Sequence, residues 1–227
     1  MVSRKKKFRL SEIDLARAAT APPNQKESII RQATGGDGYD RYRGVRDNLG
    51  PILNVALPLV SGSAVTREQI KTIVGRACNN GPGEIEGNQG IAVGLWDYVN
   101  EHKVTGATLE LEPVALGPAG RRQFWCPYIL KIDGEKYIPF FDFRGDTRLP
   151  PEGRRFVFSV NHAHIRLANP TEYREVGFVI FQFEDLKDGT RKAVPHFDNG
   201  ILFWSDKDIG KMIDEVYRLL GEIRKAA

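Results

Sequence analysis

Apolar positions recur at helical spacing through the first third of the chain. Residues 11–33 predict one or two helices, separated at Pro22-Pro23 because proline cannot sit inside a helix. Residues 39–55 place an apolar residue every three or four positions and predict an amphipathic helix, and residues 67–78 predict a shorter one. The pattern therefore indicates a helical N-terminal region over residues 10–82.

Beyond that region, helical and strand-like patterns mix. In chain order we expect a helix over 84–101, strands over 107–116, 124–132 and 136–143, a helix over 153–168, a strand over 177–184 and a helix over 206–223. The run over 177–184 is apolar almost throughout, as in a strand covered on both faces. This order predicts an α/β (α+β) fold with a mixed central sheet flanked by helices, in a domain spanning residues 83–227.

Composition supports a folded chain. The 227 residues are 41% hydrophobic, which is enough to bury a core. No run of 18 apolar residues occurs, and the N-terminus lacks the apolar stretch of a signal peptide, so we expect a cytoplasmic protein without a membrane segment. Cys78 and Cys126 lie far apart and suggest neither a disulfide framework nor a zinc site.

The positive charge of the chain is concentrated at its start. The formal net charge is +4, yet residues 1–9 carry five basic residues and no acid, so the remainder has 28 basic and 29 acidic residues, a net of −1. Residues 1–9 therefore read as a basic flexible tail, able to follow a nucleic-acid backbone or simply solvated. With the arginines of the 39–55 helix, the candidate contacts to DNA are Lys5, Lys6, Lys7, Arg41, Arg43 and Arg46.

A hairpin carries the candidate chemistry. An Asp133-Gly134 turn joins two apolar strands, and the second ends in Asp142-Phe143-Arg144, an acid and a base two residues apart. Side chains at that spacing on a strand point to the same side. Glu86 lies at the start of the preceding helix.

This order of helix, hairpin, helix and strand, with its acid-x-base motif, resembles the restriction-endonuclease-like (PD-(D/E)XK) superfamily over roughly residues 84–185. The resemblance implies a magnesium-dependent nuclease in which Glu86 and Asp142 bind Mg²⁺ and Arg144 contacts phosphate as the third catalytic residue. The chain departs from the family pattern at two positions. Tyr128 stands in place of the strand aspartate, and Arg144 replaces the family lysine.

The same residues have a structural interpretation that leaves enzymatic activity open. Asp142 and Arg144 can pair with each other at a strand end, and Glu86 can simply favour its helix start. A second motif, His162-Ala163-His164, could share a metal on a strand but not on a helix, where the two side chains are about 200° apart.

Two functions follow from these alternatives. The first is a nucleic-acid-associated protein of nuclease-like fold, either an active or a degenerate metal-dependent phosphodiesterase. The second is a non-enzymatic interaction or scaffold protein, which docks a protein partner or forms a homodimer through its helical N-terminal region.

Overall fold

The computed structural model describes residues 10–34, 41–55, 65–79, 81–187 and 190–226. The helices in these ranges are α1 (Glu12–Thr20), α2 (Pro23–Thr34), α3 (Arg43–Arg46), α4 (Leu49–Ile52), α5 (Arg67–Arg76), α6 (Pro82–Glu101), η1 (Gly117–Ala119), α7 (Pro151–Asn161), η2 (His162–Arg166), α8 (Pro170–Tyr173) and α9 (Asp206–Lys225). The strands are β1 (Thr105–Thr108), β2 (Val114–Ala115), β3 (Arg121–Arg122), β4 (Tyr128–Ile132), β5 (Glu135–Phe141), β6 (Gly177–Asp185) and β7 (Arg191–Phe197).

A five-stranded mixed sheet forms the centre of the molecule, in the order β1-β4-β5-β6-β7. Its β5 and β6 run parallel, whereas the other neighbouring strands are antiparallel. The β4–β5 hairpin has a two-residue turn, since Ile132 pairs with Glu135, and the positive φ angles of Asp133 (49°) and Gly134 (95°) suit such a turn. The predicted fold, a mixed sheet flanked by helices with further helices at the N-terminus, is confirmed.

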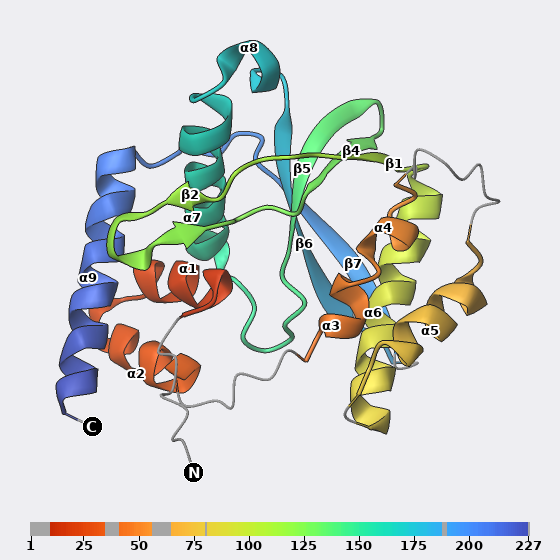
Figure 1. Cartoon of the computed structure of the whole chain (residues 1–227), viewed down its shortest axis with the longest axis horizontal. Coiled ribbons are helices and arrows are strands. Elements are labelled where there is room, and N and C mark those ends of the chain that lie inside the picture. The colour runs from red at the N-terminus through yellow and green to blue at the C-terminus, as the bar shows by residue number, and fades with distance from the viewer. Residues whose placement is uncertain (1–9, 35–40, 56–64, 80, 188–189, 227) are drawn as a thin grey trace.

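The two faces of the sheet are covered by different helices (Figure 1). Helices α1, α2, α7 and α9 lie on one side, and α3 to α6 lie on the other. Alternate residues of a strand face opposite sides, and β5 shows this directly: Ile138 and Phe140 pack with α7, whereas Phe141 packs with α6. We call these two packed regions the α7-side core and the α6-side core.

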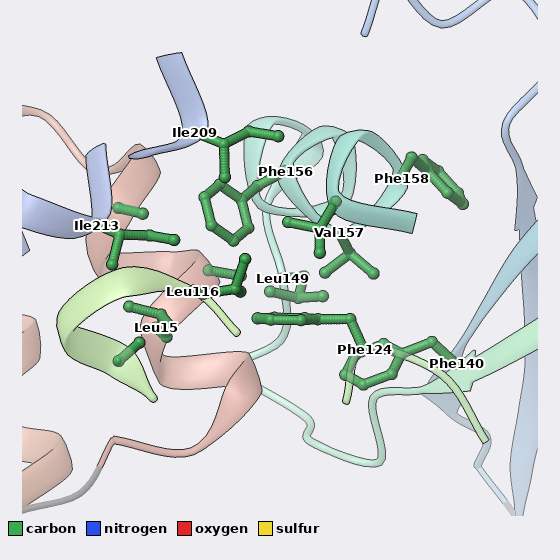
Figure 2. Packing of buried hydrophobic residues seen from close by; sticks show 14 of the residues in the cluster. Leu15, Leu116, Phe124, Phe140, Leu149, Phe156, Val157, Phe158, Ile209 and Ile213 are labelled. Carbon is green, nitrogen blue, oxygen red and sulfur yellow. The ribbon is translucent and has the colours of Figure 1, made fainter. Parts of the chain in front are cut away.

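Aromatic side chains fill the α7-side core (Figure 2). Phe124 contacts Phe140 and Phe156, with ring centroids 6.2 and 5.8 Å apart, and Leu149 lies beside them. Helix α9 covers this core with a stripe of apolar residues that includes Ile209 and Ile213. Burial of such side chains contributes about 1.5–3 kcal/mol each, so this packing positions α7 and α9 on the sheet.

A buried arginine connects distant parts of the chain on the same side. Arg122 is 2% exposed, and its guanidinium donates hydrogen bonds to the carbonyl oxygens of Leu10 and Ala119, both at 2.9 Å, and to the Tyr217 hydroxyl at 2.8 Å. The planar guanidinium has five donors and can satisfy several acceptors at once. It therefore joins the start of α1 to α9.

Several elements differ from the sequence prediction. The single helix expected over 39–55 is instead two short helices, α3 and α4, and the strand expected over 107–116 is divided between β1 and β2. Strand β7 was not predicted. The helices predicted over 84–101, 153–168 and 206–223 are confirmed, and so is the strand over 177–184, whose residues 178–183 are all buried.

The predicted division into residues 10–82 and 83–227 stays a prediction. Helices from the first part pack on both sides of the sheet: α1 and α2 join the α7-side core, and α3, α4 and α5 join the α6-side core. The tail over 1–9 lies outside the described residues. Among the residues that are described, none of the helices is long and apolar enough to cross a membrane.

Candidate functional site

The structure does not bring Glu86 and Asp142 together. Glu86 is exposed on α6, the helix that packs against the α6-side core. Asp142 is 0% exposed and continues the strand alternation after Phe141, so it faces the α7 side together with Phe140. The two carboxylates therefore lie on opposite sides of the sheet and cannot share a metal ion.

The Asp142 carboxylate is occupied by hydrogen bonds within the protein. It accepts from the backbone N–H of Leu149 at 2.6 Å, from the Gln182 side-chain amide at 3.0 Å and from the Arg144 N–H at 3.3 Å. Burial raises the pKa of Asp142, and these hydrogen bonds lower it by less. The side chain thus fixes the loop from 142 to 149 onto β6, which is a structural role.

Arg144 pairs with helix α1 instead of with Asp142. Its guanidinium makes two hydrogen bonds to the Asp14 carboxylate, at 2.5 and 2.9 Å, and a third to the Ser11 hydroxyl at 3.1 Å. Burial alone would raise the pKa of Asp14, but the hydrogen bonds and charge of Arg144 hold it below its ordinary value of 3.8. The predicted Asp142–Arg144 ion pair is therefore wrong: the acid that pairs with Arg144 lies 130 positions away in the chain.

The candidate DNA contacts are only partly visible. Lys5, Lys6 and Lys7 lie outside the described residues. Arg43 and Arg46 are exposed on α3, where Arg43 pairs with Asp47 at 3.1 Å, and Arg41 is exposed just before that helix. A role of these side chains in binding nucleic acid stays a prediction.

The histidine motif lies in the helical segment η2, where its two side chains have different partners. The described residues contain no cluster of three or more His, Cys, Asp or Glu that could hold a metal ion. His162 stacks on Phe203, with ring centroids 4.1 Å apart. His164 instead faces Asp206, with Nε2 and Oδ1 3.3 Å apart.

A hollow on the surface is lined by Leu167, Phe203 and Trp204, and Leu202 directly precedes Phe203 in the chain; we call these four residues the Leu202 surface. Leu202 is 80% exposed and Leu167 is 62% exposed, while Phe203 and Trp204 are half-buried. A hollow of about 420 Å³ lies among Leu167, Phe203, Trp204 and the two histidines. Single exposed apolar residues are common, but a hollow that several apolar side chains line is typical of a binding surface.

An irregular helical turn presents Leu167. The Leu167 N–H donates to the His162 carbonyl oxygen at 2.9 Å, five residues earlier, so η2 is a π-helical turn. Such a turn accommodates one extra residue and is frequent at functional sites. It directs Leu167 to solvent at the end of the helix begun by α7.

Arg155 holds the other side of the Leu202 surface. Its guanidinium lies over the Trp204 ring, 4.3 Å from the centroid, and its Nε donates to the Leu202 carbonyl oxygen at 2.7 Å. The backbone N–H of Trp204 donates to the Ser159 hydroxyl at 3.0 Å. Residues 202–204 are therefore fixed on α7, so the exposed side chains are preorganised for binding.

A protein-family model described as the sliding clamp-binding bacterial toxin SocB matches residues 13–226. The chain belongs to the SocB family. A curated relative, the DNA replication inhibitor toxin SocB of Caulobacter vibrioides (strain NA1000 / CB15N), is 26% identical over 218 residues, which cover 96% of this chain and 91% of the relative. No solved structure matches the chain.

Membership of the SocB family corrects the earlier resemblance. The match includes the whole stretch 84–185 on which the restriction-endonuclease-like interpretation depended, so that assignment is wrong. Nuclease, hydrolase and magnesium-dependent functions conflict with a family described as clamp-binding. The separation of Glu86 from Asp142 gives the physical reason.

The Leu202 surface was not predicted, although the sequence contains one signal of it. Residues 201–204 read Ile-Leu-Phe-Trp, four large apolar residues directly after Asn199-Gly200 and before the Ser205 helix cap. An apolar run between a turn and a helix start belongs to no regular element. Such a run is a candidate contact surface when it does not fit a helix or strand pattern.

Proposed function

We propose that this SocB-family chain binds a bacterial sliding clamp and thereby inhibits DNA replication. The family match over residues 13–226 carries the proposal, and the printed name of the Caulobacter relative supports the inhibitory outcome. A protein-binding role agrees in kind with the second function inferred from the sequence. It would place the chain in the cytoplasm, where a bacterial sliding clamp operates.

We further propose the Leu202 surface as the contact. Interfaces depend on a few anchors, and tryptophan and arginine are frequent among them. Trp204 and Arg155 are stacked here beside two exposed leucines. A partner side chain that fills the neighbouring hollow of about 420 Å³ would remove Leu167, Phe203 and Trp204 from water, and a contact that extends along the chain would cover Leu202.

Binding of the full-length chain to a purified bacterial sliding clamp tests both parts. We expect saturable binding by the unmodified chain and, for Leu202→Asp, an affinity at least about tenfold weaker, because a charge would have to be desolvated in an apolar contact. Leu186→Asp is the matched control. Leu186 is also an exposed leucine, at 46%, but it follows β6 and lies outside the apolar run over 201–204.

The outcomes separate the function from its location. Absence of binding by the unmodified chain, with the clamp shown active toward another ligand, would refute the function. Equal binding by Leu202→Asp and the unmodified chain would refute only the contact surface. Residues 56–64, which begin with the apolar run Ala-Leu-Pro-Leu-Val and lie outside the described residues, would then be the next segment to vary.

Replication provides the second readout. Expression of the unmodified chain in bacteria should stop incorporation of labelled thymidine, whereas Leu202→Asp should relieve the arrest and Leu186→Asp should not. An arrest that persists in a variant unable to bind the clamp would show that inhibition has another route.

A further inference from the structure

Three basic side chains from three elements meet beside the first turn of α7. His196 of β7 pairs in register with Ile180 of β6, so its side chain lies on the α7 side of the sheet, where Gln182 also points. Arg154 of α7 reaches this face and donates to the Gln182 side-chain oxygen at 3.0 Å and to the Leu149 carbonyl oxygen at 3.3 Å. Both acceptors are neutral, so neither offsets the arginine charge, on which the buried Asp142 carboxylate acts through space.

The third group is Arg148, which stands directly before Leu149. The Leu149 N–H is held by the buried Asp142 carboxylate at 2.6 Å, so the backbone that carries Arg148 is fixed. Arg148 is exposed and makes no ion pair within the part of the chain that the structure describes. Its side chain is therefore available to a ligand.

The electrostatic effects on His196 and Arg154 agree with this placement. Burial, together with the charges of Arg154 and Arg148, lowers the pKa of His196 to about 4, while Glu184 acts in the opposite sense. Burial and Arg148 also lower the pKa of Arg154, against the charge of Asp142. At neutral pH the folded protein thus places two guanidinium charges near a neutral imidazole, an arrangement that a bound anion would stabilise.

The start of α7 adds to the same field. Pro150 is its N-cap residue and makes no side-chain cap hydrogen bond, so the first-turn N–H groups have no capping oxygen from that side chain. A helix N-terminus carries partial positive charge and favours anions. The nearest carboxylate on this turn, Glu152, is directed to Arg155, 3.5 Å away.

We propose that Arg148, Arg154 and His196 form a binding site for a phosphate group. Two guanidinium groups match the oxygens of a phosphate, and an imidazole donates one hydrogen bond when neutral and two when protonated. The site is separate from the Leu202 surface, because Arg154 points to Gln182 while its neighbour Arg155 points to Leu202 and Trp204. Either free phosphate compounds or the backbone of duplex DNA could supply the group.

Titration of the full chain with inorganic phosphate at constant ionic strength, followed by the NMR resonances of the histidine rings, tests the site. We expect phosphate to shift the His196 resonances and to raise the pKa of His196 above about 4, because a bound anion favours the protonated ring. The His102 resonances should not move, since His102 faces Asp133 at the β4–β5 turn.

Arg148→Gln should weaken phosphate binding by about tenfold, the loss of one charge-assisted contact. Arg76→Gln is the control, because Arg76 is likewise exposed but lies on α5, on the other side of the sheet. Unshifted His196 resonances, or equal affinities for the two variants, would overturn the proposal. Competition by a short DNA duplex for the same shift would identify the source as a nucleic-acid backbone, and phosphate binding without such competition would identify free phosphate compounds.

Discussion

Replacing Asp142 with alanine should destabilise the protein, because its carboxylate accepts three hydrogen bonds in a site without solvent access. The substitution leaves the Leu149 N–H without an acceptor, whereas the Gln182 amide keeps its bond to the Leu149 carbonyl oxygen at 2.9 Å. One stranded buried donor costs about 1–3 kcal/mol and each further lost hydrogen bond about 1 kcal/mol, which gives about 3–5 kcal/mol in total.

That loss is a large share of the roughly 5–15 kcal/mol by which a domain is stable. Urea denaturation followed by circular dichroism measures it directly. Asp142→Asn retains the volume and one acceptor oxygen, so we expect an intermediate loss. Asp146→Ala, at an exposed position of the same loop, should change the stability by less than about 0.5 kcal/mol. An Asp142→Ala variant as stable as Asp146→Ala would refute the assigned structural role.

Two further predictions concern other contacts. Asp14→Asn should lower the free energy of unfolding at neutral pH, because the folded-state pKa of Asp14 lies below its ordinary value of 3.8. The stabilising contribution of the Asp14 carboxylate is present above pH 3.8 and is lost as the pH falls through the folded-state pKa. The urea midpoints of the variant and the parent should therefore converge only in strong acid. Gly94→Ala should prevent stable packing of α6 on β7, because a Cβ atom there would lie 1.5 Å from the Arg191 carbonyl oxygen. Gly87→Ala is the control and should fold normally, because a Cβ atom at Gly87 would have no atom within 4 Å. Similar melting temperatures for the two variants would contradict this prediction.

Periodicity predicted the elements whose pattern is set by local burial. The stripe of α9 and the continuous apolar run of β6 are visible in the sequence because each element buries one or both faces along its length. Strand β7 was not predicted, since Pro195 and several polar residues interrupt its pattern of apolar positions. The predicted helix over 39–55 divides because its packing is tertiary: at Gly44 a Cβ atom would lie 2.7 Å from the Cys78 sulfur.

The candidate site shows what sequence alone could not supply. The spacing of Asp142 and Arg144 is visible, but the burial of Asp142 and the pairing of Arg144 with Asp14 depend on segments that meet only in the fold. Likewise, residues 201–204 are plainly apolar in the sequence, whereas the 80% exposure of Leu202 is a property of the folded surface. A sequence motif of common residue types therefore does not distinguish a structural carboxylate from a functional one until the fold is known.

The arginine at 122 has a consequence for synthesis of the chain. The Arg122 guanidinium bonds both the Leu10 carbonyl oxygen and the Tyr217 hydroxyl. During translation, this contact between the start of the chain and α9 cannot form until almost the whole polypeptide has left the ribosome. A product terminated before residue 206 would lack the helix that shields Leu15 and Phe156 from water. Such fragments would expose this apolar core, so we expect them to be more readily degraded by proteases than the complete chain.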